Sequence, residues 1–416
     1  MKTIVSRQLK LMAYCAAGLL ANLSVQAAET PKSGLAIAVE QAWRLNTQAA
    51  GLDAREAEAR ATKDVAAGLT PEPGSVSIGS LNDRINRNQG TQEYEVELAV
   101  PLWLPGQKAA REAEAASRID EAAARHFAVR LEVSGEVREA WWALATARST
   151  KILAARRLET ARAMETDVMR RYKVGELSRI DANLAQTETY AASAELVEAE
   201  STLLQAEQAV QTLTGSPAPK NLDEESPTTR RLIGEAGDSA ETHPLLAATA
   251  AAARSARARV RVADESRRTA PELTLRVVRE RSDFAEAYSN RVGIKLKIPF
   301  SSDSQVRRET SAAQAEANQS DADLLRTQTR VRLDVERAQR NLQSAERQLA
   351  MAQERRQLSA ENLRLAEKAF SLGESDLATL LRIRAAAFDA DAFFDRQRVA
   401  RAAAISRLNQ ALGVLP

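Results

Sequence analysis

The sequence predicts an α+β chain in which very long helices alternate with short β-hairpins, and in which this arrangement is built twice. Three observations support this fold class: prolines and glycines recur at one constant offset, two segments alternate between apolar and polar residues, and a long Ala-, Arg- and Glu-rich segment with helical periodicity follows each of them. Aromatic residues make up only 4% of the chain. Thin walls of closely packed helices therefore fit the composition better than a thick core.

The duplication defines the domain organisation. Four pairs of residues are each separated by 198 positions: Pro73 and Pro271, Pro101 and Pro299, Gly175 and Gly373, Gly215 and Gly413. The predicted order is a signal peptide over 1–27, a first repeat over 28–215, an inter-repeat linker over 216–241 and a second repeat over 242–416. The linker is predicted because the segment is rich in Pro, Ser, Thr and charged residues.

The first 27 residues have the three parts of a secretory signal: a basic start, an apolar core over 11–23 and a small-residue site ending at Ala27. The single cysteine, Cys15, lies in that core, so the mature chain has no thiol and no disulfide. Removal of the signal peptide takes the formal charge of the chain from +2 to −1, and this charge gives no support to nucleic-acid binding.

Strands are predicted over 75–81, 92–100, 272–278 and 288–298. The second shows the pattern best, because Tyr94, Val96 and Leu98 fall on one face while three glutamates fall on the other. Prolines end the second and fourth strands, and long helices follow. The helix over 108–172 has about 65 residues and spans on the order of 95 Å.

A heptad seam runs along the second long helix and predicts left-handed supercoiling. It is formed by Val331, Val335, Ala338, Leu342, Ala345, Leu349 and Ala352. The first repeat keeps this register from Val133 to Ala147, after which Lys151 breaks the seam. The predicted molecule is a rod.

Strands of seven to eleven residues with one apolar face have the length that an outer-membrane strand needs. No run of eighteen apolar residues beyond Ala28 predicts a transmembrane helix. Four strands cannot close a barrel, so a spanning chain must oligomerise, and two, three or four copies would each give an even number of strands. A soluble sheet packed on helices is the alternative.

At this point the chain resembles the TolC-like outer-membrane efflux proteins over nearly its whole mature length. The resemblance rests on the duplicated pattern and on two turns at equal places in it, Tyr172-Lys173-Val174-Gly175-Glu176-Leu177-Ser178 and Phe370-Ser371-Leu372-Gly373-Glu374-Ser375-Asp376. It implies a homotrimer with a twelve-stranded barrel in outer-membrane lipid and an α-helical tunnel across the periplasm. It also implies two partners, a periplasmic adaptor (membrane fusion) protein and an inner-membrane pump of the RND type.

The resemblance also assigns candidate sites. The turns would be the tips where the adaptor docks, through Val174, Gly175, Glu176, Leu177, Ser178, Leu372, Gly373, Glu374 and Ser375. The family closes its tunnel with inward carboxylates; here the second-repeat places hold Thr379 and Arg382, so Asp181 is the one candidate for a constriction, and an ordinary solvated helix residue is the favoured interpretation.

In the barrel, the polar strand faces are predicted to meet the lumen, where charges of opposite sign line the pore or pair across neighbouring strands. The candidates are Glu93, Glu95, Glu97, Arg291, Lys295 and Lys297. Aromatic residues at strand ends, including Tyr94, Phe284 and Tyr288, fit an interfacial girdle.

The sequence offers no constellation for catalysis. His126 and His243 are far apart, no phosphate-binding glycine loop follows a strand, and no metal or cofactor site is predicted. The protein is predicted to be a duct and not an enzyme. The alternative function is a periplasmic coiled-coil adaptor or scaffold, and the residues do not identify the cargo.

Overall fold

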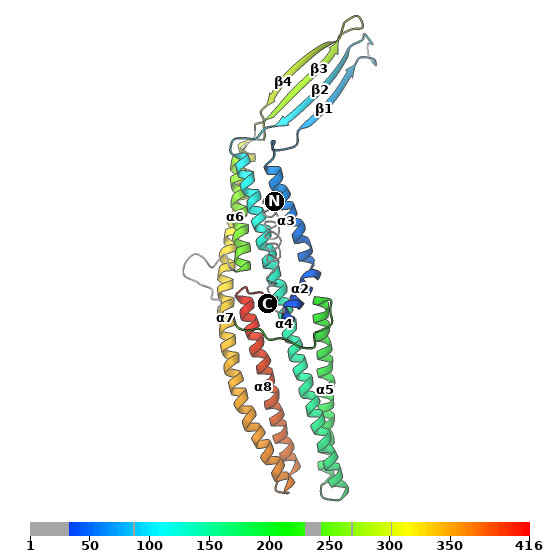
Figure 1. Ribbon diagram of the computed structural model, residues 1–416, viewed down its shortest axis with the longest axis vertical. Helices are drawn as coiled ribbons and strands as arrows, with labels where there is room; N and C mark the ends of the chain where they lie inside the picture. Colours follow the sequence, from blue (N-terminus) through cyan, green and yellow to red (C-terminus); the bar gives the residue numbers. More distant parts are fainter. Residues whose placement is uncertain (1–32, 86–87, 229–242, 268, 301) are drawn as a thin grey trace, which may run out of the picture.

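The computed structural model describes residues 33–85, 88–228, 243–267, 269–300 and 302–416. Figure 1 shows an elongated molecule with a β-sheet at one end and two helical hairpins at the other. The two longest helices, α4 (Gln107–Lys173) and α7 (Asp303–Ser371), connect these ends. The predicted combination of a rod and strands is therefore confirmed, whereas the predicted signal peptide over 1–27 lies outside the described residues.

The two repeats supply the same kinds of element in the same order. The first contains α2 (Gly34–Leu45), α3 (Thr47–Ala66), β1 (Ser75–Asn82), β2 (Gln92–Pro101), α4 and α5 (Arg179–Thr214). The second contains α6 (Pro244–Glu265), β3 (Glu272–Arg281), β4 (Ser289–Lys297), α7 and α8 (Leu377–Ala411).

The first repeat opens with two helices, α2 and α3. Asn46 has an extended backbone between α2 and α3, and its side-chain oxygen accepts hydrogen bonds from the amides of Gln48 and Ala49. An Asn in this position caps the following helix and interrupts the preceding one. The second repeat has the single helix α6 at the equivalent place.

The four strands form one antiparallel sheet in the order β1-β2-β3-β4. The two predicted hairpins are thus joined, because β2 of the first repeat pairs with β3 of the second over ten residue pairs from Gln92↔Arg281 to Pro101↔Glu272. The register places Val76, Leu98, Leu275 and Ile294 side by side across all four strands. One face of the sheet is consequently apolar and exposed, as the alternating pattern predicted.

Below the sheet, the helices pack through small residues. The predicted seam is confirmed on α7, where Val331, Val335, Ala338 and Ala352 are buried. The buried apolar residues form separate clusters along the rod, with one around Trp141 at mid-height and one around Phe370 near the tips. This distribution fits a thin helical wall, since the rod has no single thick core.

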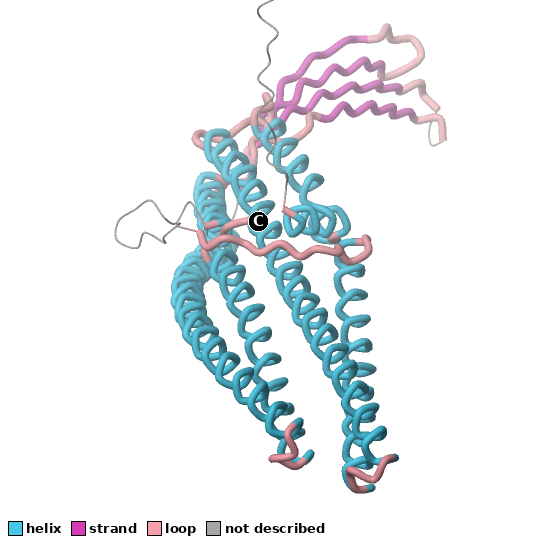
Figure 2. Tube along the Cα trace, turned by 60° about the horizontal axis from the view of Figure 1, so that its bottom comes forward, coloured by secondary structure: helices cyan, strands magenta, loops and turns pink. Residues whose placement is uncertain are grey.

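The described part of the inter-repeat segment, residues 216–228, packs against the bundle at mid-height and is here called the equatorial strap (Figure 2). Glu225 forms an ion pair of 2.7 Å with Arg138, whose side chain is 1% exposed. Asp223 accepts the amide of Gly34, and Asn409 of α8 donates to the carbonyl of Ser226. The strap therefore ties α2, α4 and α8 together, although the sequence predicted only a linker.

Candidate functional site

The polar face of the sheet collects the charged strand residues. Glu93, Glu95 and Glu97 of β2 surround Arg276 of β3, which approaches Glu93 to 3.3 Å and Glu97 to 3.6 Å and contacts Glu95 most closely. This arrangement follows from the register, in which Glu97 is directly opposite Arg276. One guanidinium thus balances part of a three-carboxylate cluster at the centre of this face.

The predicted basic residues of β4 lie on the same face but do not reach the glutamates, because β3 lies between β2 and β4. Arg291 pairs with Glu280 at 2.8 Å. Lys295 and Lys297 form no ion pair within the described part of the chain. Arg276 was not predicted as a site residue, although its place in the alternation with Glu272 and Thr274 was the available signal.

The two tips have matching geometry. After α4, Gly175 has φ +82°. The amide of Gly175 donates a hydrogen bond to the carbonyl of Tyr172, and the amide of Glu176 donates one to the carbonyl of Arg171. After α7, Gly373 has φ +76° and the same two bonds lead to Phe370 and Ala369. Left-handed backbone at this position is the usual helix ending, and glycine adopts it without steric cost.

The helices that leave the tips are capped. Ser178 begins α5 in a capping box, in which its hydroxyl accepts the amide of Asp181 and the Asp181 carboxylate accepts the amide of Ser178. Asp376 begins α8, and hydrogen bonds from the hydroxyl and amide of Thr379 hold the pKa of its carboxyl below its ordinary value. Asp181, the candidate constriction residue, therefore has its carboxylate engaged in a helix cap.

The tips differ in how far their predicted docking residues are exposed. Val174 is 69% and Leu372 is 63% exposed, whereas Leu177 packs against the apolar cluster at the base of the tips and Ser375 is half-buried. Ile180, which was not predicted as a docking residue, is 71% exposed in the first turn of α5. Its signal was an isolated large apolar residue in a polar first turn.

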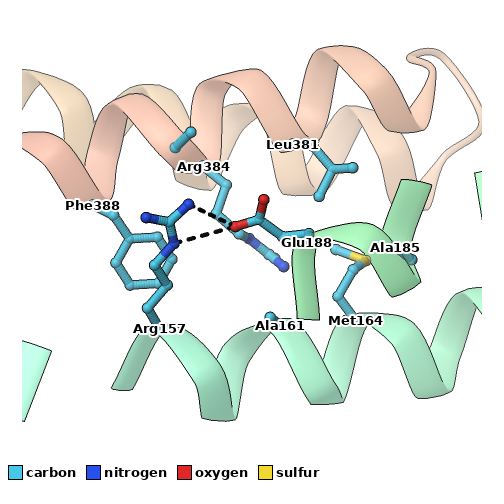
Figure 3. A pocket seen from close by; sticks show the side chains of 9 residues that line it. Arg157, Ala161, Met164, Ala185, Glu188, Leu381, Arg384 and Phe388 are labelled. Carbon is cyan, nitrogen blue, oxygen red and sulfur yellow. Dashed lines mark hydrogen bonds and ion pairs between the residues drawn. The ribbon is translucent and has the colours of Figure 1, made fainter. Parts of the chain in front are cut away.

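A narrow cleft lies between the α4/α5 and α7/α8 hairpins above the tips. Figure 3 shows Arg157 of α4 reaching Glu188 of α5, with Phe388 and Arg384 of α8 facing the pair. The guanidinium of Arg157 donates to Glu188 at 2.9 Å and to Glu195 at 2.7 Å. The cleft is too small for a cofactor, and its charged groups hold adjacent helices together.

Within the described residues, no group of His, Cys, Asp and Glu side chains is arranged to hold a metal ion. In the same part of the chain, none of the helices combines the length and the apolar character needed to cross a bilayer. The site of this protein is thus a set of surfaces: the sheet faces, the helical wall and the two tips.

Solved structures share this architecture. The chain superposes on the CmeC outer membrane channel of Campylobacter jejuni with a TM-score of 0.73 and 16% identity, covering 91% of this chain and 85% of that one. For VceC, an outer membrane protein of Vibrio cholerae, the TM-score is 0.73 at 15% identity, with 91% and 96% covered. For the MtrE outer membrane channel of Neisseria gonorrhoeae the TM-score is 0.68 at 16% identity, with 91% of this chain and 89% of that chain covered.

A sheet continued by a long helical wall is thus the fold that this chain shares with these solved outer membrane proteins. The sequence model of the outer membrane efflux protein family matches residues 36–216 and 236–414. The chain belongs to this family and is an outer-membrane efflux channel that extends into the periplasm. The alternative of a periplasmic adaptor is therefore wrong. Comparison with curated protein sequences gives no match.

Proposed function

We propose that three copies of this chain close one barrel and one tunnel. Among the described residues of the single chain, β1 pairs only with β2 and β4 pairs only with β3, so the sheet has two open edges. An open strand edge is not stable in lipid, because its backbone groups have no partners there. Joining β4 of one copy to β1 of the next removes both edges, and the family resemblance supports three copies and twelve strands.

In this barrel the apolar face of the sheet meets lipid and the polar face lines the pore. The pore-lining charges are then Glu93, Glu95 and Glu97 around Arg276, with Arg291, Lys295 and Lys297 of β4. What supports the assignment is the exposed apolar band across all four strands, which is the feature that carries the whole proposal.

The tips dock a periplasmic adaptor, which links the duct to an inner-membrane pump of the RND type. Val174, Leu372 and Ile180 supply exposed apolar surface at the end of the rod, and the two glycine turns present it twice with nearly equal geometry. Glu176, Ser178, Glu374 and Ser375 contribute polar contacts beside it. Asp181 serves the cap of α5, and any narrowing of the tunnel by its carboxylate is secondary.

The first experiment measures single-channel conductance of the purified mature protein in planar bilayers, together with native mass in detergent from the same sample. Discrete openings from a particle of three chains are expected. A water-soluble species that gives no conductance after reconstitution would overturn the proposal.

Tip docking is tested in cells that carry the cognate adaptor and pump. Val174→Glu with Leu372→Glu is expected to abolish photo-crosslinking to the adaptor and efflux of a reporter dye, because charge in an apolar contact is not compensated. Val197→Glu on α5 is the matched control, since Val197 is 64% exposed and lies away from the tips. Unchanged crosslinking in a correctly trimeric tip variant would rule out docking at this surface.

A further inference from the structure

The apolar face of the sheet carries two charged residues, and both are arginines at its outer end. Along the four strands, this face presents Val, Leu, Ile, Ser, Asn, Gln and Tyr side chains and, on β3, Arg279 and Arg281. Every glutamate of the strands lies on the opposite face, where Glu93, Glu95 and Glu97 contact Arg276 and Glu280 pairs with Arg291. The two arginines, here called the outer-rim pair, thus have no acidic neighbour on their own face of the strands.

Aromatic side chains hold the pair in place. The guanidinium carbons of Arg279 and Arg281 lie 4.8 and 4.9 Å from the ring centre of Tyr288, and Arg281 lies 5.4 Å from that of Phe284. Tyr288 is itself fixed by a hydrogen bond to Gln92 and by the ring of Tyr94 at 6.4 Å. Two guanidinium groups on one ring are oriented before any ligand arrives, which lowers the entropic cost of binding.

The pair keeps donors available. Arg281 donates one bond to the carbonyl of Gly90 at 3.2 Å and one to Gln92 at 3.1 Å, which uses two of its five N–H groups. Arg279 is exposed and forms no hydrogen bond or ion pair with the described residues, apart from its contact with the ring. Three N–H groups of Arg281 and the five of Arg279 therefore have no acceptor among the described residues, and both side chains belong to the face of the sheet that is proposed to meet lipid.

The depth of the pair matches a headgroup. From Leu273 to Arg281 is eight residues, or about 27 Å of strand. With the tilt usual for such barrels, this corresponds to about 21 Å of membrane, close to the height of the apolar band of an outer-membrane barrel. The hairpin loops lie at the end of the sheet away from the helices, so the pair lies at the outer boundary of the bilayer (Figure 1).

We propose that Arg279 and Arg281 bind a membrane lipid whose headgroup carries a phosphomonoester, with Tyr94 and Tyr288 packing against it. Guanidinium groups bind phosphate oxygens in bidentate pairs, and two of them match the charge of about −1.5 to −2 on a phosphomonoester at neutral pH. A zwitterionic headgroup lacks this match because its cationic part would meet two more cations. The proposal rests on the assignment of the apolar face to lipid.

The test uses the trimer in nanodiscs of phosphatidylcholine with minor amounts of phosphatidic acid and phosphatidylglycerol, and counts the lipids retained on the trimer by native mass spectrometry. Wild type is expected to retain phosphatidic acid above the other two lipids. In the double variant Arg279→Gln and Arg281→Gln, the enrichment of phosphatidic acid is expected to fall by a factor of about ten or more, because charge-assisted hydrogen bonds are lost. Arg291→Gln removes a charge at similar height on the opposite face and should leave the enrichment unchanged.

Equal enrichment in wild type and in the double variant would overturn the proposal, as would no enrichment in wild type. A rise in melting temperature with inorganic phosphate, in a protein that does not retain phosphatidic acid, would show that the site binds a free anion and would overturn the proposal of a lipid site. Conductance of the same samples separates the two proposals: a conducting trimer without lipid enrichment refutes the lipid site alone, and a protein that forms no channel refutes the duct.

Discussion

At each tip a single glycine reverses the chain. For a side chain placed there, the cost of the backbone conformation can be separated from the cost of steric clashes. A Cβ added to Gly175 or to Gly373 meets no heavy atom within 4 Å, yet both residues have positive φ. A side chain at either position therefore has space but an unfavourable backbone. The tip geometry depends on conformational freedom rather than on close packing.

We predict that Gly175→Ala destabilises the protein by about 1 kcal/mol, the usual cost of left-handed backbone for a residue with a Cβ. Urea-induced unfolding of the detergent-solubilised protein measures it. Gly51→Ala is the control: Gly51 also has open space around it but lies inside α3, where alanine stabilises a helix by up to about 1 kcal/mol. If the unfolding free energies of Gly175→Ala and Gly51→Ala changed in the same direction, the conformational explanation would be contradicted.

At the scale of elements, the sheet is the part whose two faces have different surroundings. Adjacent residues of β4 make this difference testable, because Val292 lies on the apolar face beside Val277 and Gly293 lies on the polar face beside Arg276. Both positions are exposed in the single chain. Their difference therefore arises only when the barrel forms in lipid.

Val292→Arg is predicted to impair membrane assembly, since an arginine on the lipid face near mid-depth costs about 2–4 kcal/mol. Gly293→Arg places the same side chain one residue away, on the pore side, and is predicted to assemble. The yield of trimer in outer-membrane fractions measures both. Equal yields would mean that the apolar face does not meet lipid.

At the scale of the whole molecule, the equatorial strap joins the two repeats into one wall. Its central contact is the buried Arg138, which bonds to Glu225 of the strap, to Gln410 of α8 and to the carbonyl of Val414. The hydroxyl of Ser406 also donates to Glu225. A buried charge with this many partners is costly to leave unpaired.

Glu225→Ala is predicted to destabilise the protein by about 3–5 kcal/mol, because it leaves the Arg138 guanidinium buried without a carboxylate. Glu139→Ala breaks the ion pair between α4 and Arg407 of α8, but both side chains are more than half exposed, so a cost below about 1 kcal/mol is expected. Denaturant unfolding compares the two, and limited proteolysis within 216–228 should increase only in the first. Similar losses of unfolding free energy in the two variants would show that burial of an ion pair does not determine how much it stabilises this protein.

Local pattern predicted much of this molecule, because its strands and helices repeat with short periods. Alternation identified all four strands to within a few residues, and the heptad spacing from Val331 to Ala352 predicted the buried seam. Contacts between distant segments were not predictable in this way. The pairing of β2 with β3, the glutamates around Arg276 and the strap each bring together residues that no local period relates.

The contacts of Arg138 also constrain the order in which the chain matures. Its partners lie 87 and 276 residues further along the sequence, at Glu225 and Val414. During export from the N-terminus, the guanidinium therefore meets its last partner only when the end of the second repeat has arrived. A chain interrupted before that point contains every long helix of its first repeat but lacks the Gln410 and Val414 partners of a buried charge, so we expect the middle of the rod to close only after translocation is complete.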